Sequence, residues 1–309
     1  MEKCHFIRLL TDDTPEGPTL SVLSKLLIHN HPVLPPPIGR VSPHLHHGFN
    51  SAARLTAIGI GRDGARMAAF LSKNQPNLEC YEIYYSQRIH KETQPSTLYL
   101  SIMNSDLIFV MFGSDVGKSY IQLQAICDLS TENNIPTIGI HPYGPTYPAI
   151  RDCTDYNFRV SAESISSTKG KTSNSSKTLS MYAGRHIIQV ITDMITQRSL
   201  ICVDFNDIKT VLNYGKIGLL GTGVATGPDA GRQATALAMD RILAQGCKLE
   251  KAKGALLIMQ GSSFLKIENF EGMTYSALKY LSIEDKIVLG LTQNDELGYN
   301  VKVSVLIVM

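Results

Sequence analysis

The chain has 309 residues, of which 43% are hydrophobic and 18% are charged, and its formal net charge is +2. This length and apolar content are sufficient for a large core in one or two domains. The sequence has no basic stripe of the kind that binds nucleic acid, and no apolar run long enough for a transmembrane helix.

Six cysteines are scattered along the chain without pairs or CxxC spacing. This pattern is typical of a reducing compartment, so we expect a cytoplasmic protein with no disulfide and no zinc site. Two of them, Cys127 and Cys247, fall in helix-like stretches and are expected in the core. The charged start of the chain, soon interrupted by prolines, is unlike a signal peptide.

Residues 1–50 contain several prolines and are predicted to form an irregular extension. Within them, residues 20–29 have the pattern of one short amphipathic helix, which could dock on the body of the protein, on a partner or on a membrane surface. A histidine cluster follows, at His44, His46 and His47. Because no cysteine or acidic cluster accompanies it, a solvated tail is favoured over a metal site.

From Leu55 onward, apolar runs alternate with helix-like segments, which predicts an α/β fold with a parallel sheet covered on both faces. Strands are predicted at 55–60, 80–85, 106–112, 136–141 and 156–161, and helices at 63–74 and 117–132. The Ser-, Thr- and Lys-rich segment 161–178 is predicted to be a loop. A central helix at about 179–197 should then end just before Asp204.

Two glycine-containing loops follow predicted strands. Glycine lets the backbone approach a phosphate closely, and ligands of open α/β sheets bind at the carboxyl ends of strands. We therefore expect a pocket beside both loops. Its candidate residues are Gly59, Gly61, Gly64, Gly113, Gly117, Lys118 and Ser119.

Both loops allow other interpretations. The spacing of Gly59, Gly61 and Gly64 also matches a dinucleotide fingerprint, with Glu79 or Glu82 as its acidic partner. The second loop, GSDVGKS, is similar to a P-loop but has three spacer residues where four are required. These alternatives remain open at the level of sequence.

Asp204 and Asp207 lie three residues apart where a strand-like run turns into a helix. This spacing places both carboxylates on one side of the first helical turn. They could be the N-cap and the N3 acid of that helix, both favoured by its free amides and dipole. They could equally form a catalytic pair.

The segment from about Met181 to Val308 resembles the FtsZ branch of the tubulin superfamily. The resemblance runs through LICVDFNDIKTV, the stretch Gly215–Leu243 with a predicted glycine turn at Gly221–Ala225 and a cap at Asp229, KGALLIMQGSSFLKIENFEGM, and the closing DKIVLGLTQNDELGYNVKVSVLIV. These motifs occur in the order that the family has.

The resemblance implies a tubulin/FtsZ-like fold with a Rossmann-like parallel nucleotide-binding sheet and a second α/β domain with a mixed sheet. The implied segments are the extension 1–50, a GTPase domain at 51–178, a central helix and linker at 179–203, and a C-terminal domain at 204–309. Helices are expected in the C-terminal domain at about 229–245 and 274–281. The chain stops where the closing strands end, without the family's linker and adaptor-binding tail.

The resemblance also implies a cytoskeletal protein of cell division whose subunits stack head to tail, with itself or another FtsZ-like subunit as partner. GTP would be the cofactor, held by the two glycine loops. Lys118 and Ser119, which the P-loop interpretation adds, are further candidates for contact with a phosphate. Asp204 and Asp207 would act in trans on the GTP of the neighbouring subunit.

Several family positions differ in this sequence. The glycine- and threonine-rich phosphate loop retains only Gly113 and Gly117, and Asp115 adds a negative charge. Ala65 replaces an expected Asn, and Met181 and Tyr182 stand where the family holds guanine with an Asn-Asp pair.

We therefore expect weak or absent GTP binding. The first hypothesis is a GTP-dependent filament subunit or filament modulator. The alternative is a non-catalytic pseudo-GTPase that caps or regulates a competent FtsZ-like filament. A third, more remote interpretation is an unrelated nucleotide-dependent enzyme.

Overall fold

The computed structural model describes most of the chain beyond residue 52. The described residues are 4–9, 53–85, 95–113, 120–142, 154–160, 173–196, 199–201, 203–283 and 286–309. None of the helices formed by these residues is both long and apolar enough to cross a membrane.

The described strands form one eleven-stranded sheet in the order β1-β3-β2-β4-β5-β6-β8-β11-β9-β10-β7. They are β1 (Cys4–Leu9), β2 (Leu55–Ile60), β3 (Leu78–Tyr85), β4 (Leu107–Phe112), β5 (Thr137–Pro142), β6 (Tyr156–Val160), β7 (Ser199–Ile201), β8 (Ile217–Thr226), β9 (Gly254–Gly261), β10 (Ile287–Gln293) and β11 (Asn300–Val308).

The N-terminal strands β1 to β6 are all parallel. The central strands β2 and β4 are mostly apolar and are buried along their whole length, because helices cover both of their faces. On one face lies α2 (Gly61–Asn74) and on the other lie α3 (Pro95–Asn104) and α4 (Tyr120–Glu132). The predicted strands 106–112 and 136–141 form β4 and β5 and pair in parallel, as expected for a parallel sheet.

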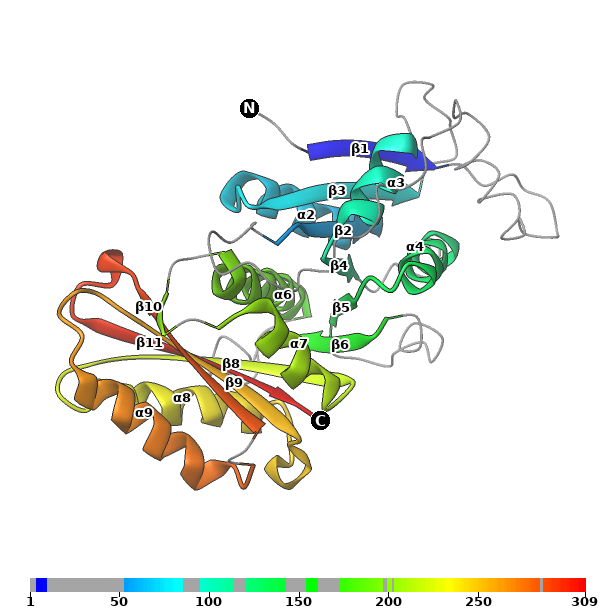
Figure 1. Cartoon of the computed structure of the whole chain (residues 1–309). Coiled ribbons are helices and arrows are strands. Elements are labelled where there is room, and N and C mark those ends of the chain that lie inside the picture. The colour runs from blue at the N-terminus through cyan, green and yellow to red at the C-terminus, as the bar shows by residue number, and fades with distance from the viewer. Residues whose placement is uncertain are drawn as a thin grey trace, which may run out of the picture.

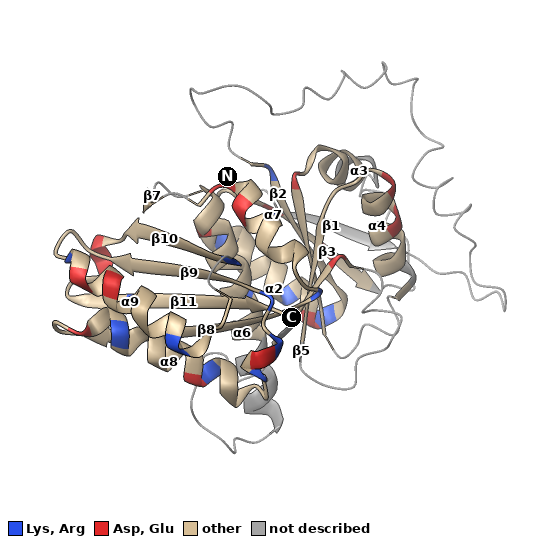
Figure 2. Cartoon of the chain, turned by 60° about the horizontal axis from the view of Figure 1, so that its bottom comes forward, with Lys and Arg blue, Asp and Glu red and all other residues tan. Residues whose placement is uncertain are grey.

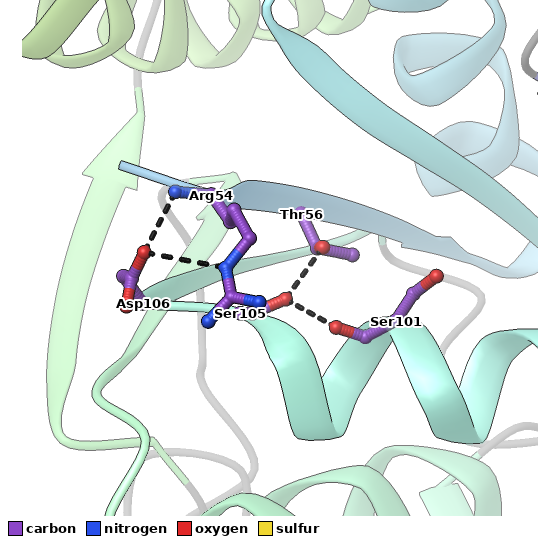
Figure 3. Close-up of polar contacts among 5 residues, drawn as sticks. All are labelled: Arg54, Thr56, Ser101, Ser105 and Asp106. Carbon is purple, nitrogen blue, oxygen red and sulfur yellow. Dashed lines mark hydrogen bonds and ion pairs between the residues drawn. The ribbon is translucent and has the colours of Figure 1, made fainter. Parts of the chain in front are cut away.

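Polar contacts fix the amino ends of β2 and β4 beside each other (Figure 3). The Arg54 amide donates to the Asp106 carboxylate at 2.8 Å, and the Arg54 side chain lies 3.8 Å from the same oxygen. The hydroxyls of Thr56 and Ser105 share a hydrogen bond of 2.6 Å, and Ser105 also donates to the Ser101 carbonyl at the end of α3. These contacts lie at the edge opposite the strand ends where the sequence predicts a pocket.

The C-terminal half is a mixed sheet, in which β11 runs antiparallel to β8 and β9, and β9 is parallel to β10. The helices α8 (Ala230–Ala244) and α9 (Ile267–Tyr280) pack on one face. On the other face lie α6 (Ser173–Thr196) and α7 (Phe205–Asn213). The described residues of this half also form short 3-10 turns at Leu249–Lys251 and Asp295–Leu297. Figure 2 shows charged residues on the outer surfaces of α8 and α9, away from the strands.

The central helix α6 lies between the two sets of strands (Figure 1). Its residues Ile187, Ile188 and Ile191 belong to one buried cluster that includes side chains from α2, the parallel strands and the C-terminal strands. The parallel pairing of β6 with β8 joins the two halves into one sheet. The two halves therefore share a hydrophobic core and a line of backbone pairing between β6 and β8, which we call the β6–β8 seam.

The structure corrects several boundaries. The strand β1 lies within the predicted irregular extension, and α3 was not predicted. The helix α6 starts at Ser173, inside the predicted loop, and the short strand β7 separates its end from Asp204. The helix α9 starts at Ile267 rather than near 274. These segments have weak periodicity, so their structure depends on neighbours that are distant in sequence.

The predicted glycine turn at Gly221–Ala225 is wrong, because these residues lie inside β8. A Cβ at Gly221 would lie 2.0 Å from the Ala238 carbonyl oxygen, and one at Gly223 would lie 1.9 Å from that of Ala234. The glycines therefore let α8 lie directly on the strand. The chain turns at Gly227, whose φ is +95°.

Candidate functional site

The order of the parallel strands determines where a ligand site would lie. The chain passes from β2 to β3 on one side and then to β4 on the other side of β2. The carboxyl ends of β2 and β4 therefore form a topological switch point, where open α/β sheets bind their ligands. Gly61 begins α2 directly after β2, and Gly113 directly follows β4.

Four of the candidate glycines come together at this point. A Cβ at Gly59 would lie 2.2 Å from the Gly64 carbonyl oxygen, and a Cβ at Gly64 would lie 2.2 Å from that of Met111. Gly61 has a φ of +72°, which turns the chain sharply from strand into helix. Gly59 and Gly64 thus hold the first turn of α2 directly against β2 and β4.

Asp63 lies at the centre of this arrangement. It is the third residue of α2, and only 3% of its surface is exposed. A Cβ at Gly113 would lie 2.5 Å from both Cβ and Oδ2 of Asp63. The side chain of Asp63 therefore lies against the backbone at the end of β4. This residue was not predicted from the sequence, although its position beside Gly64 could have been a signal.

Three candidate phosphate-binding residues, Gly117, Lys118 and Ser119, lie outside the described residues, as does Asp115. Their proposed contacts remain predictions, and so does the P-loop interpretation.

The dinucleotide interpretation requires an acid at the end of the neighbouring strand. Both candidates lie on β3 and bind tyrosine hydroxyls of the same strand. Glu79 accepts from Tyr81 at 2.7 Å, and the buried Glu82 accepts from Tyr84 at 2.8 Å. Because both carboxylates bind tyrosines of their own strand, neither supports the dinucleotide interpretation.

The positions that would hold guanine in the resembled family lie within α6, more than two turns after its first residue, Ser173. Met181 is half-buried, Tyr182 is exposed, and the guanidinium of Arg185 lies 4.0 Å from the centre of the Tyr182 ring. The same guanidinium lies 3.8 Å from the Phe70 ring of α2. This stack of Phe70, Arg185 and Tyr182 joins α2 to α6 through cation-π contacts. It was not predicted from the sequence.

Asp204 and Asp207 form a reciprocal capping box at the start of α7. Asp204 Oδ1 accepts from the Asp207 amide at 2.7 Å, and Asp207 Oδ2 accepts from the Asp204 amide at 3.0 Å. The capping interpretation is therefore confirmed as local structure. The box uses one oxygen of each carboxylate, and Asp204 is exposed while Asp207 is half-buried. Capping thus leaves a further role for the acids open.

Asp229 precedes α8, as predicted, but its side chain makes no cap hydrogen bond. It binds Arg232 at 2.7 Å instead. In the closing segment, Asn294 caps the 3-10 turn by accepting from the Glu296 amide.

A polar layer between α6 and the C-terminal sheet was also not predicted. The His186 ring lies 2.9 Å from the Thr222 hydroxyl, which lies 3.1 Å from that of Ser304. Loss of hydration, together with the nearby positive charges of Lys302 and Arg241, lowers the pKa of His186 to about 3. Burial also lowers the pKa of Lys302, and the negative charge of Asp193 partly offsets this lowering. His186 is therefore neutral near pH 7.

The C-terminal half carries a hollow of about 530 Å³ at the ends of β8 and β9 and the start of β11. Phe264 and Tyr299 stack beside it with ring centres 5.2 Å apart, and both are largely exposed. Among the residues that the structure describes, no group of three or more His, Cys, Asp or Glu side chains could hold a metal ion.

Comparisons with known proteins agree with this architecture. Residues 217–309 match the model of the FtsZ family C-terminal domain. The cell division protein FtsZ of Buchnera aphidicola is 26% identical over 118 residues, which cover 38% of this chain and 31% of that protein. That of Pseudomonas aeruginosa is 24% identical over 218 residues, covering 64% and 55%. The chain thus spans about a third to a half of the length of these relatives.

Solved structures match over a longer part of the chain. An empty FtsZ dimer from M. jannaschii covers 82% of this chain and 88% of its own, with a TM-score of 0.70 and 17% identity. A GTPgS-bound protofilament of CetZ2 from Haloferax volcanii covers 82% and 92%, with a TM-score of 0.56 and 13% identity. The chain therefore has the FtsZ/tubulin fold, and its residues 217–309 are similar to the C-terminal domain of the FtsZ family.

Proposed function

We propose that this protein is a cytoskeletal protein related to cell division, which joins or regulates a filament of FtsZ-like subunits. The similar proteins named cell division protein FtsZ support this proposal, and so do the similar structures of an FtsZ dimer and of a CetZ2 protofilament. The segments 51–178, 179–203 and 204–309 would be its nucleotide-type domain, linker and C-terminal domain. Cys80, Cys127 and Cys247 are buried and form no disulfide, which supports a reducing cytoplasm.

The observation that carries the proposal is the pair of acids at the start of α7. Their capping box fixes both carboxylates at one helix end, yet leaves one oxygen of each outside the box. An acid pair that is held rigidly and accessible to solvent is suited to polarising a water molecule at a contact with another subunit. A head-to-tail contact of this kind extends into open filaments.

We further propose that the chain's own site does not hold a triphosphate. Gly61, Gly64 and Gly113 bring backbone together at the strand ends, but the Asp63 side chain lies in the space beside Gly113. We therefore favour a non-catalytic subunit or modulator over a GTPase that turns over its own nucleotide. The GTP-dependent subunit remains the second candidate, because the glycines converge at the switch point where a nucleotide would bind.

The test is a mixture of the purified protein with a competent FtsZ. If the acids act in trans, the wild-type protein will change the partner's GTP turnover and assembly, measured by phosphate release and sedimentation. Replacing both Asp204 and Asp207 by Asn will abolish this effect while preserving stability, because Asn is also a good N-cap.

The matched control is Glu268→Gln, which removes an exposed acid from the first turn of α9. This variant should behave as the wild type does. If the wild-type protein leaves the partner's turnover and assembly unchanged, the proposed function is wrong and the acids serve only as a cap.

A further inference from the structure

One surface of α2 and α6 combines exposed aromatic rings with positive charge. On α2, Arg66, Phe70 and Lys73 are exposed at positions i, i+4 and i+7, which places them on one face of the helix. On α6, Tyr182 and Arg185 lie at i and i+3, and the Arg185 guanidinium lies over both the Phe70 and the Tyr182 rings. We call Arg66, Phe70, Lys73, Tyr182 and Arg185 the α2–α6 patch.

The positive charges of this patch have no acidic partner. Among the described residues, the side chains of Arg66, Lys73 and Arg185 form no ion pair, and Arg185 Nε is buried without a hydrogen-bond acceptor. The carboxylates of the same two helices lie elsewhere, since Asp63 is buried at the start of α2 and Asp193 lies about two turns beyond Arg185. Buried donors without a partner are rare in folded proteins and call for an explanation.

We propose that the α2–α6 patch binds an acidic segment of a partner protein that also carries an apolar side chain. A carboxylate of the segment would accept from the planar guanidinium of Arg185, the group best suited to hold a carboxylate through paired hydrogen bonds. The charges of Arg66 and Lys73 would attract the neighbouring acids of the segment.

The aromatic rings explain why the partner needs an apolar side chain. Phe70 is 40% exposed and Tyr182 is 51% exposed, so an apolar side chain of the segment would remove part of both rings from water. Contacts with the two rings also restrict Arg185 before any partner arrives, so that binding costs little side-chain entropy. Arginine and tyrosine held in this way are typical of the residues that dominate binding energy at protein interfaces.

Other anionic partners fit the patch less well. Basic clusters that bind an anionic membrane have about four to eight cations, more than Arg66, Lys73 and Arg185 provide. Nucleic acid requires cations spread along a stripe that follows the phosphates, and the chain as a whole has a net charge of only +2. A short acidic segment needs neither.

A purely structural role of the stack is the competing explanation, in which Arg185 only joins α2 to α6. Loss of Arg185 would then lower stability and change no binding. Arg66 and Lys73 separate the two explanations, because their exposed side chains form no ion pair with the described residues and contribute little to stability. Only recognition of an acidic segment predicts that replacing them weakens binding.

The experiment is a fluorescence anisotropy titration of the full chain against labelled synthetic peptides. In these peptides glutamates flank one leucine or phenylalanine at varied spacing. We expect saturable binding that weakens as the salt concentration rises, and no binding of the same peptides with glutamine in place of glutamate.

Variants of Arg185 test how the carboxylate is recognised. Arg185→Gln should weaken binding at least about tenfold, because charge-assisted hydrogen bonds are lost. Arg185→Lys keeps the charge without the planar fork and should lose most of the affinity as well. The matched control is Lys279→Gln, which removes an exposed cation that lies 4.4 Å from the Tyr275 ring on α9 and should leave binding unchanged.

The inference is overturned if no peptide of the set binds, if the glutamine peptides bind equally well, or if both Arg185 variants bind as the wild type does. Circular dichroism establishes folding. If the Arg185 variants do not fold, the double variant Arg66→Gln/Lys73→Gln decides, and it should bind more weakly and with a smaller dependence on salt.

Vesicles containing phosphatidylserine and a single-stranded DNA are titrated in the same way. If either binds more tightly than the peptides and loses its binding in Arg185→Gln, the patch serves a membrane or nucleic acid and the inference is wrong. The inference does not depend on the proposed function, because the mixing experiment tests Asp204 and Asp207 at the start of α7.

Discussion

Individual polar side chains carry out three different tasks in this protein. Asp204 and Asp207 close the start of α7 with reciprocal hydrogen bonds. Asp63 is buried against Gly113 at the end of β4. His186 is held neutral between the central helix and the C-terminal sheet. Each of these positions depends on a specific backbone geometry around the residue.

The pH dependence of stability tests the environment of His186. Its pKa is about 3 in the folded protein against 6.5 for the ordinary side chain, so the unfolded chain binds a proton that the folded chain does not. Stability is therefore full above pH 6.5 and falls as the pH drops toward 3. Between pH 7 and pH 5 this one group should cost about 2 kcal/mol.

The measurement is urea unfolding of the wild type and of His186→Gln at several pH values in this range. Gln retains a hydrogen-bonding group toward Thr222 but does not titrate. The difference in unfolding free energy between the two proteins should change with pH as described. If it stays constant from pH 7 to pH 5, His186 is hydrated and its pKa is not lowered.

At the scale of elements, glycines decide how closely helices lie on the sheet. Gly59 and Gly64 do so for α2, and Gly221 and Gly223 do so for α8. In both cases a backbone carbonyl occupies the space that a Cβ would need. Rigid backbone cannot move aside as the end of a flexible side chain can, so these contacts fix the helix positions.

Two helical glycines make a matched test of this packing. A Cβ at Gly64 would lie 2.2 Å from the Met111 carbonyl oxygen, whereas one at Gly272 in α9 has its nearest neighbour at 3.4 Å. Gly64→Ala should destabilise the protein by about 1–3 kcal/mol through overpacking. Gly272→Ala should be neutral or stabilise it by up to about 1 kcal/mol, because Ala is the better helix former. Thermal unfolding measures both, and equal effects would contradict the close packing of α2.

For the whole molecule, the shared core and the β6–β8 seam link the two halves. Phe158 of β6 pairs with Gly218 of β8, and a Cβ at Gly218 would lie 2.2 Å from the Phe158 ring. Because α6 packs on both sets of strands, we expect both halves to unfold in one cooperative transition. Calorimetric and van't Hoff enthalpies of unfolding should then agree.

The seam itself is tested by a double-mutant cycle. Gly218→Ala should destabilise the protein by roughly 1–3 kcal/mol, since the new methyl group meets the Phe158 ring. Adding Phe158→Leu should recover part of this loss, so that the double variant is more stable than the sum of the single effects. Strict additivity would show that the two residues are not in contact.

The sequence by itself determined the parallel α/β half, the capping acids and the order of the C-terminal elements. Long apolar runs such as LTAIGI and LIFVMF have few alternatives to buried strands, and an acid pair at N-cap spacing is a local signal. The predicted buried positions of Cys127 and Cys247 are confirmed, although only Cys127 lies in a helix and Cys247 follows the end of α8. These features depend on residues close together in the chain.

Only the tertiary structure decided the features that depend on distant neighbours. The strand β1 exists by pairing with β3, and Gly221 and Gly223 lie in a strand rather than a turn because α8 packs on them. The contact of Asp63 with Gly113 and the polar layer around His186 each join elements that are far apart in sequence. Local patterns do not specify such contacts, because their energy comes from burial and close packing that arise only when the sheet assembles.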